Sequence, residues 1–312
     1  MRSALLWVSL LGVPAVYAQR PVTVRYEKDN SGTYTFFAHN GDYCPYTVRV
    51  LFQTLTNLRA DRSLPYVGEC QPGQTVLFRL QRIQPNQPSN FNYSTRYYKG
   101  CMQPKVDTTV VYLLPVAPGK PTQVRELEYI GRQLGGETEP RNWYALQFMM
   151  NAGDTVFAVR RGIVTQVEDD VQVSGPAINY YRNENRVQVY HADCSFATYT
   201  VFKQKSIFVR PGQTINPGDP IGIVGGDAYS SGPQVRLFVH YNENQSIMDV
   251  GQPASQNAYW AYVRPKFWTN QGRATHLVKN RIYIADHDET VVTQEMSKRE
   301  IKNRKKTKST GQ

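Results

Sequence analysis

The sequence predicts an all-β protein built from two β-rich segments. Aromatic residues make up 12% of the 312 residues, and tyrosine (21 copies) outnumbers phenylalanine (12). Aromatic and β-branched residues favour strands, while the 22 glycines and 19 prolines supply turns between them. Short runs of alternating polar and apolar residues recur along the chain, and no stretch before the basic C-terminus has helical periodicity.

The first 18 residues have the pattern of a signal peptide. Arg2 precedes the apolar run "ALLWVSLLGV", and Val16 and Ala18 occupy the small-residue positions before a cleavage point. The apolar run is shorter than the roughly 20 residues that a membrane span needs. The sequence therefore predicts an exported protein, periplasmic or secreted.

Residues 21–117 are expected to form an immunoglobulin-like β-sandwich. Alternating runs such as "GTYTFFAHN" and "YTVRVLFQTL" are separated by turn signals such as "NGD" and "QPGQ". Six or so strands at this spacing are typical of such a sandwich. The stretch "APGKPTQ" (117–123) is predicted to be a linker.

A second β-rich segment is expected over residues 118–250, again with strands separated by glycine-containing turns. Residues 251–296 are rich in aromatic residues and are expected to pack back on this segment. Within them, the part around "NRIYIADHDETVV" is expected to add a last strand.

The four cysteines are predicted to be structural, because disulfides persist in an oxidising compartment. Their spacing, without a Cys-x-x-Cys pair, argues against a zinc cluster. Sequence cannot choose among the three pairings, but one bridge is expected within the first segment. The candidates are Cys44, Cys70, Cys101 and Cys194.

Much of the formal net charge of +11 lies in residues 297–312, which are predicted to be a disordered basic tail. A second interpretation is a contact for an anionic surface. Export makes nucleic acid the least suitable partner, so no nucleic-acid binding is predicted. The basic residues of the tail are Lys298, Arg299, Lys302, Arg304, Lys305, Lys306 and Lys308.

Three motifs in the second segment, in order, resemble those of the lysostaphin/LytM-type zinc endopeptidases. The stretch "AGDTVFAVRRGIVTQVED" (152–169) matches the family's glycine-threonine-valine-alanine-glycine pattern, and "VRPGQTINPGDPIGIVGG" (209–226) matches its hairpin and glycine turn. "SSGPQVRLFV" then stands where the family has a glycine-proline turn and a His-x-His strand. The resemblance covers roughly residues 125–245 and implies the antiparallel β-sheet domain of that family.

The resemblance also implies that the zinc site is lost. The family's zinc ligands are histidines and an aspartate, with a further histidine as the base for bound water. The aspartate position is Gln147, the His-x-His pair is Gln234 and Arg236, and the base position is Val201, two residues after Tyr199. Amides are poor zinc ligands, and neither arginine nor valine offers a lone pair. No catalytic residue and no cofactor is therefore predicted.

Other residues do not rebuild a metal site. His191 matches a family position that is not a ligand and is expected to be a hydrogen-bonded structural histidine, with Asp193 capping a turn. His240 lies about 13 Å along the strand from Arg236. The exposed stretch "ADHDET" (285–290) is expected to be surface, although Asp286, His287 and Asp288 could form a weak cation site.

The functional prediction is an inactive, exported relative of the endopeptidases that binds a wall peptide or a wall-hydrolase partner. Gln147, Tyr199, Gln234 and Arg236 are its predicted binding residues, suited to a carboxylate-bearing peptide. A blander alternative is that Gln234 and Arg236 hydrogen bond to each other in a filled core. Two other functions stay open at this stage: an active zinc endopeptidase of the bacterial wall, which would need zinc, and a structural envelope component.

Overall fold

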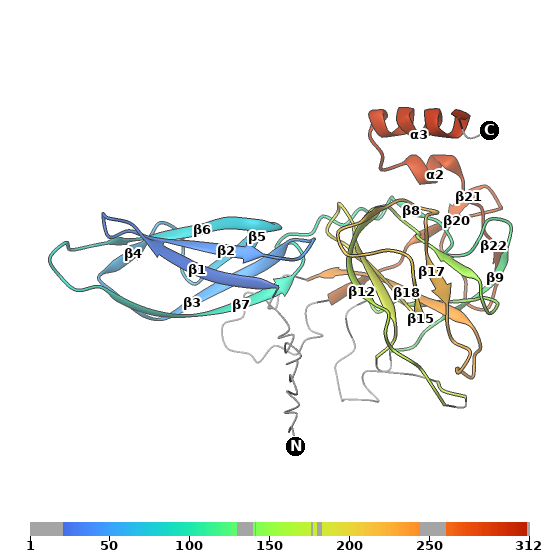
Figure 1. The fold of residues 1–312 in the computed structure, drawn as a ribbon, viewed down its shortest axis with the longest axis horizontal. Coiled ribbons are helices and arrows are strands. Elements are labelled where there is room, and N and C mark those ends of the chain that lie inside the picture. Colours follow the sequence, from blue (N-terminus) through green and yellow to red (C-terminus); the bar gives the residue numbers. More distant parts are fainter. Residues whose placement is uncertain are drawn as a thin grey trace, which may run out of the picture.

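The computed structural model describes residues 21–129, 140, 142–175, 177–179, 183–243 and 260–310. Its described elements are strands, apart from two short helices near the C-terminus, so the predicted all-β class is confirmed. An elongated N-terminal part carries strands β1 to β7, and a second part carries the remaining strands and both helices (Figure 1). The predicted signal peptide lies outside the described residues.

The N-terminal part consists of two antiparallel sheets. One has the strand order β1 (Val22–Lys28), β2 (Tyr34–Asn40), β6 (Gly73–Arg82) and β4 (Leu58–Ala60). The other has the order β5 (Tyr66–Cys70), β3 (Tyr46–Thr56) and β7 (Asn90–Lys99). Aromatic side chains fill the core, where the rings of Phe36 and Phe78 stack with centroids 4.6 Å apart. The immunoglobulin-like assignment stays a prediction.

A single asparagine carries the chain from one of these sheets to the other. Asn57 separates β3 from β4 and has a φ of 54°, a left-handed conformation that asparagine tolerates better than most residues. Its side-chain amide donates to the carbonyl oxygens of Gln84 and Gln87, both at 2.9 Å, and its side-chain oxygen accepts from the backbone N–H of Gln84 at 2.8 Å. The turn is thereby fixed to the loop after β6.

One large antiparallel sheet dominates the second part. Its strands run in the order β16 (Thr214–Ile215), β12 (Gly162–Glu168), β13 (Arg186–Tyr190), β14 (Phe196–Thr200), β18 (Gln234–Asn242), β10 (Leu146–Met149), β9 (Pro121–Glu126) and β22 (Ile282–Ile284). β19 (Trp260–Val263) also pairs with β18. Because side chains alternate along a strand, β18 directs Val235, Leu237, Val239 and Tyr241 toward the core and the residues between them to the opposite face.

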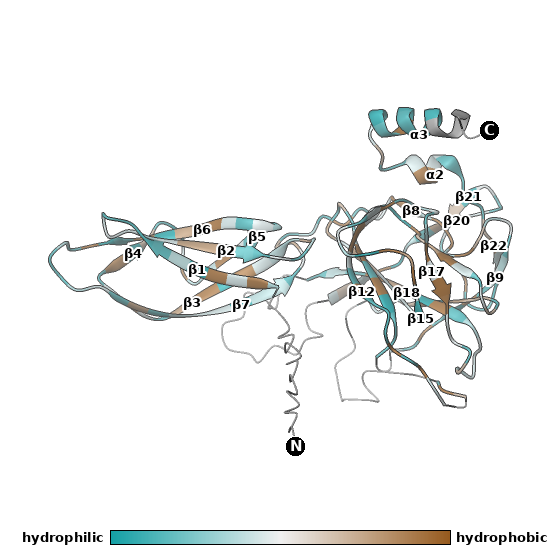
Figure 2. Ribbon diagram, in the orientation of Figure 1, coloured by the Kyte–Doolittle hydropathy of each residue, from teal (hydrophilic) through white to brown (hydrophobic). Residues whose placement is uncertain are grey.

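Two three-stranded sheets complete the second part. One contains β11 (Thr155–Phe157), β17 (Pro220–Val224) and β15 (Phe202–Ile207), and the other contains β8 (Val111–Tyr112), β20 (Lys266–Thr269) and β21 (Arg273–Thr275). β19, β20 and β22 lie in the stretch predicted as an aromatic-rich extension, and each pairs with a strand from elsewhere in the chain. Hydrophobic residues gather in the strands of the second part, including β17 (Figure 2).

The structure corrects the prediction of a disordered tail. Residues Lys298–Thr310 form helix α3, which follows the short helix α2 (Glu289–Thr293). Local chemistry explains α3: Ser297 and Glu300 have the Ser-x-x-Glu spacing of a capping box, and lysine and arginine are good helix formers. Asp288 caps α2, whose five residues are too few for a visible helical period. In the described part of the chain, no helix has the length and apolar character needed to cross a membrane.

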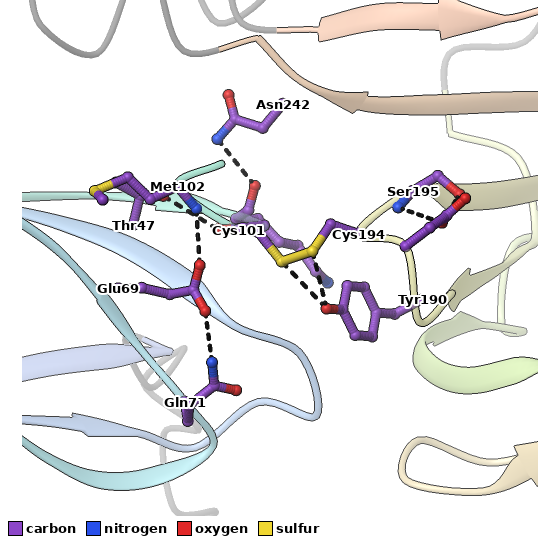
Figure 3. The surroundings of a disulfide bond; sticks show 12 residues. Thr47, Glu69, Gln71, Cys101, Met102, Tyr190, Cys194, Ser195 and Asn242 are labelled. Carbon is purple, nitrogen blue, oxygen red and sulfur yellow. Dashed lines mark hydrogen bonds between the residues drawn. A yellow bond between two sulfur atoms is a disulfide. The ribbon is translucent and has the colours of Figure 1, made fainter. Parts of the chain in front are cut away.

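The structure also corrects the predicted disulfide within the first segment. Cys101, just after β7, is bonded to Cys194 in the turn between β13 and β14, and Cys44 and Cys70 are buried free thiols (Figure 3). Spacing along the chain could not show that β7 ends beside this turn. The disulfide therefore links the two parts of the chain and does not cross-link residues within the first part.

Other contacts reinforce this junction. The Tyr190 hydroxyl lies 3.2 Å from the Cys101 sulfur, and Phe196 of β14 is fully buried in the same hydrophobic cluster as the sandwich core. The Asn242 side chain donates to the Lys99 carbonyl oxygen at 3.4 Å. The N-terminal sandwich is thus packed against one end of β14 and β18.

Candidate functional site

Strand pairing assembles the candidate site on the face of the large sheet opposite the core. Arg236 of β18 stands between Gln147 of β10 and Thr200 of β14. The row continues to Arg125 of β9 on one side and Arg186 of β13 on the other. Side chains of directly paired residues lie on the same face of a sheet. The pairing therefore aligns three arginines across five strands.

Arg236 is held by a partner that the sequence motifs did not reveal. Its Nη1 donates to Glu184 Oε1 at 2.8 Å, and its Nη2 donates to the Asn179 carbonyl oxygen at 3.2 Å. The Tyr229 hydroxyl donates to the same Glu184 oxygen at 2.6 Å, and the guanidinium lies 5.0 Å from the Tyr229 ring centroid. Glu184 and Tyr229 are therefore part of the site, and only the tertiary structure identifies them.

The two glutamines of the site are buried. Gln147 is 5% exposed and its side-chain amide contacts the Met149 sulfur at 3.3 Å. Gln234 is fully buried, and neither polar atom of its side chain has a hydrogen-bond partner in the described part of the chain. The expected alternative, in which Gln234 and Arg236 satisfy each other, is wrong because Arg236 pairs with Glu184.

These residues do not fit a zinc ion. Zinc in a catalytic site requires three ligands with available lone pairs, usually imidazole, thiolate or carboxylate. The four predicted family positions offer two neutral amides, a guanidinium and a valine, and the carboxylate of Glu184 is already paired with Arg236. In the ranges the structure describes, no group of three or more His, Cys, Asp or Glu is placed to hold a metal.

Val201, which the sequence predicts to stand at the position of the family's catalytic base, has an unusual backbone. Its φ is +73°, a left-handed conformation that is a rare outlier for a β-branched residue. The conformation is held by its carbonyl oxygen, which accepts from the Gly225 N–H at 2.8 Å. A Cβ on Gly225 would lie 2.8 Å from the Phe202 carbonyl carbon, so a glycine is required for this close approach of two backbones.

A cavity of about 160 Å³ lies beside Val201. Its walls combine apolar residues with polar and charged ones, among them Lys203, Asp227 and Glu184, and the ring of Tyr229 also lines it. The cavity thus adjoins both the base position and the partners of Arg236. Its apolar walls include Val171, Val173, Val201, Phe202 and Ala228.

We expect Val201→Gly to destabilise the protein by about 2 kcal/mol less than Val187→Gly. Both valines are buried, so each change removes about 1.5–3 kcal/mol of hydrophobic burial. At position 201 glycine also relieves left-handed strain of about 1–2 kcal/mol, whereas in β13 it adds a cost of about 0.5–1 kcal/mol. Urea unfolding of the two variants measures the difference. Equal losses would contradict the strain at Val201.

Tyr199 was predicted to be a binding residue, but its side chain does not lie on the sheet face that carries the candidate site. It pairs with Leu237, so its side chain lies on the core face of the sheet. It is fully buried, and its hydroxyl accepts a hydrogen bond from the Val159 N–H at 2.9 Å. Burial raises the pKa of the phenol well above its usual range. Tyr199 therefore supports the loop before β12.

The histidines near the site have structural contacts. His191 is fully buried and its Nδ1 donates to the Arg161 carbonyl oxygen at 2.6 Å, in line with the expected structural role. Its neighbour Asp193 accepts from the Ser195 N–H at 3.0 Å, as a turn cap does, and also binds Arg160 at 2.9 Å. His240 is buried among aromatic rings, with the Trp260 centroid 4.4 Å away.

The side chains of the acidic stretch at 285–290 also make hydrogen bonds within the structure. Asp286 accepts from the Trp268 indole N–H at 3.0 Å, and His287 Nε2 lies 3.0 Å from the Val116 carbonyl oxygen. Asp288 accepts from the Thr290 N–H at 2.8 Å at the start of α2. The three side chains therefore point to separate partners.

A family model supports the resemblance seen in the sequence. Residues 141–248 match the model of peptidase family M23. No curated protein matches the chain.

Several solved structures are similar. A putative peptidase M23 from Pseudomonas aeruginosa is 14% identical, with a TM-score of 0.29, over 62% of this chain and 82% of that one. The catalytic domain of lysostaphin from Staphylococcus simulans is 20% identical, with a TM-score of 0.24, over 36% and 86%. Helicobacter pylori Csd3 is 13% identical, with a TM-score of 0.29, over 92% and 84%.

Proposed function

Residues 141–248 form a peptidase family M23 domain, and we propose that this domain binds a peptide without cleaving it. The ligand is a carboxylate-bearing peptide of the bacterial cell wall, and the chain acts as an exported binding or regulatory module of the envelope. A segment of a wall-hydrolase partner is the alternative ligand. Fold alone does not imply activity, so the proposal depends on the residues of the site.

The observation that carries the proposal is the row of arginines across the sheet, in which Arg236 is paired with Glu184 and Arg186 with Glu168. Where the family places a metal-site histidine, this chain has Arg236, and its pairing partners extend the row to Arg125 and Arg186. Neighbouring strands lie about 4.8 Å apart, so the outer arginines are about 20 Å apart at their backbones. A row of this length suits an extended peptide crossing the strands, and guanidinium groups suit its carboxylates.

Hydrogen-bonding groups of the site that lack a partner also support the proposal that it binds a peptide. The Nε of Arg236 and both polar atoms of Gln234 lack partners in the described part of the chain. A buried polar group left without a partner costs about 1–3 kcal/mol, and a water or a ligand group would remove that cost. The cavity beside Val201, lined by apolar and polar residues, is large enough for a short aliphatic side chain.

The first experiment tests the loss of catalysis. The full chain, purified without chelators, is expected to contain far less than one zinc per molecule and to release no fragments from purified cell walls. Zinc is measured by mass spectrometry and wall cleavage by chromatography of released muropeptides. Near-stoichiometric zinc together with cleavage would overturn the proposal in favour of an active endopeptidase.

The second experiment tests binding, by calorimetry with muropeptides. Arg125→Gln is expected to weaken binding about 10- to 100-fold, because a hydrogen bond to a charged group contributes about 1.5–3 kcal/mol. The double variant Glu184→Gln/Arg236→Met tests the centre of the row without leaving an unpaired carboxylate. Arg59→Gln, on the exposed surface of the sandwich strand β4, is the matched control. Equal affinities for all four proteins would contradict the site, and no binding of any muropeptide would contradict the ligand.

A further inference from the structure

Helix α3 is a positively charged element fixed to the edge of the molecule. Its 13 residues contain a single acid, Glu300, and Ile301 is the only large apolar residue among them. The helix projects from the second part of the chain, above α2 (Figure 1), and is hydrophilic over most of its length (Figure 2). The helix therefore does not serve to fill a hydrophobic core.

Two consecutive arginines of the body hold the segment that carries the helix. Arg160 binds Glu295 through two nitrogens, with distances of 2.8 to 3.2 Å. Arg161 binds Glu300 inside the helix at 2.5 Å. Arg304, one turn later, returns to Glu289 of α2 at 2.8 Å. Glu295 and Glu300 are thus directed toward the body, and Glu289 of α2 binds Arg304.

The helix start is fixed by its own residues as well. The Ser297 backbone N–H and hydroxyl both donate to Glu300, at 2.8 and 2.7 Å. The Arg161 side chain, together with these bonds, lowers the pKa of Glu300 to about 2. These contacts therefore favour the ionised form of the carboxylate.

The face turned away from the body is cationic. Glu300, Ile301 and Arg304 lie on one side because residues four apart share a helix face, and all three are partly buried. The exposed residues on the remaining surface are Lys298, Arg299, Lys302, Asn303, Lys305 and Lys306. This face has no acid and no large apolar side chain.

We propose that α3 docks the protein on an anionic phospholipid bilayer through the headgroup phosphates. Clusters of lysine and arginine are attracted to anionic leaflets, and the attraction falls off within a Debye length. Without an apolar face the helix does not insert between acyl chains as an amphipathic anchor does. A peripheral, straight helix about 20 Å long presents its charges to a flat surface without a clash with the body.

The experiment is flotation of the full chain with vesicles of phosphatidylcholine alone or with 30% phosphatidylglycerol. We expect binding only to the anionic vesicles and its loss at high salt. The variant Lys298→Ala/Arg299→Ala/Lys302→Ala/Lys305→Ala should weaken binding on the order of 1,000-fold. Alanine preserves the helix, which circular dichroism can check.

A matched control separates the helix from net charge. Lys105→Ala/Lys266→Ala/Arg273→Ala/Lys279→Ala also removes three lysines and one arginine from exposed positions. Both quadruple variants change the net charge from +11 to +7, since 11 − 4 = 7. The control should keep most of the affinity, and equal losses would overturn the assignment to α3.

A third variant tests whether the helix must be held in place. Glu300→Gln raises the net charge by one but removes the bond to Arg161, so it should weaken binding if fixed presentation matters. Stronger binding would show that only the charge of α3 matters, and it would contradict the idea that α3 must be held to the body by Arg161. Binding to soluble polyphosphate or DNA, with none to anionic vesicles, would overturn the choice of a bilayer. None of these outcomes depends on the peptide site.

Discussion

Replacing Arg160 by methionine is expected to lower the free energy of unfolding by about 3–5 kcal/mol. The Arg160 side chain is 1% exposed and binds Asp193 at 2.9 Å and Glu295 at 2.8 Å. It also donates to the Tyr112 hydroxyl at 2.9 Å. Methionine would leave two buried carboxylates without their cation. Urea unfolding followed by tryptophan fluorescence measures the loss.

The neighbouring arginine provides the control. Arg161 binds Glu300 at a more exposed position, so Arg161→Met should cost far less stability than Arg160→Met. Adding Asp193→Asn and Glu295→Gln to Arg160→Met should recover much of the loss, because no unpaired carboxylate remains. Equal destabilisation by the two single variants would show that Arg160 is not the centre of this cluster.

Lowering the pH should destabilise the protein before the pH is low enough to protonate its carboxylates. Burial, together with nearby cations, lowers the pKa of both His191 and His240 from 6.5 to about 3. Both are neutral in the folded and unfolded chains above pH 6.5, so stability is full there. As the pH falls toward 3, only the unfolded chain takes up protons, and stability is lost. The loss at pH 5 is about 4 kcal/mol for the two groups.

Unfolding measured between pH 7 and pH 4.5 tests this slope. The double variant His191→Asn/His240→Phe should flatten it, because asparagine can still donate to the Arg161 carbonyl and phenylalanine suits the aromatic surroundings of His240. His287, whose pKa burial also lowers, should account for part of any remaining slope. His39→Asn, at an exposed strand position, should leave the profile unchanged. A slope retained in full by the double variant would contradict the assignment.

The sequence alone was sufficient to predict the resemblance to peptidase family M23, whose model matches residues 141–248. Glycine-containing turns surround "SSGPQVRLFV" and predict which residues stand at the histidine positions. Alternation along a strand then places Gln234 and Arg236 on one face, and the pairing of β18 agrees with it. These properties are local, because turn chemistry and a period of two act within a few residues.

The alternation of side chains along a strand was not sufficient to predict which face of the sheet Tyr199 occupies. Its position two residues before Val201 suggested a shared role, but the chain turns into the left-handed region at Val201 and alternation stops there. The strand that contains Tyr199 directs it to the core. A sequence pattern carries no sign of such a backbone change when the residue is valine, which rarely adopts it.

The partners of the site were decided by tertiary structure. Glu184 reaches Arg236 across 52 residues, and Arg125 joins the row because β9 pairs with β10. The Cys101–Cys194 bond spans 93 residues, and the acids that hold α3 pair with arginines more than 130 residues away in the chain. Local sequence determines which face a residue occupies, whereas which charges meet depends on how distant strands assemble. For this protein the sequence therefore predicted which residues stand at the zinc-site positions, and only the folded structure showed that Arg236 binds Glu184.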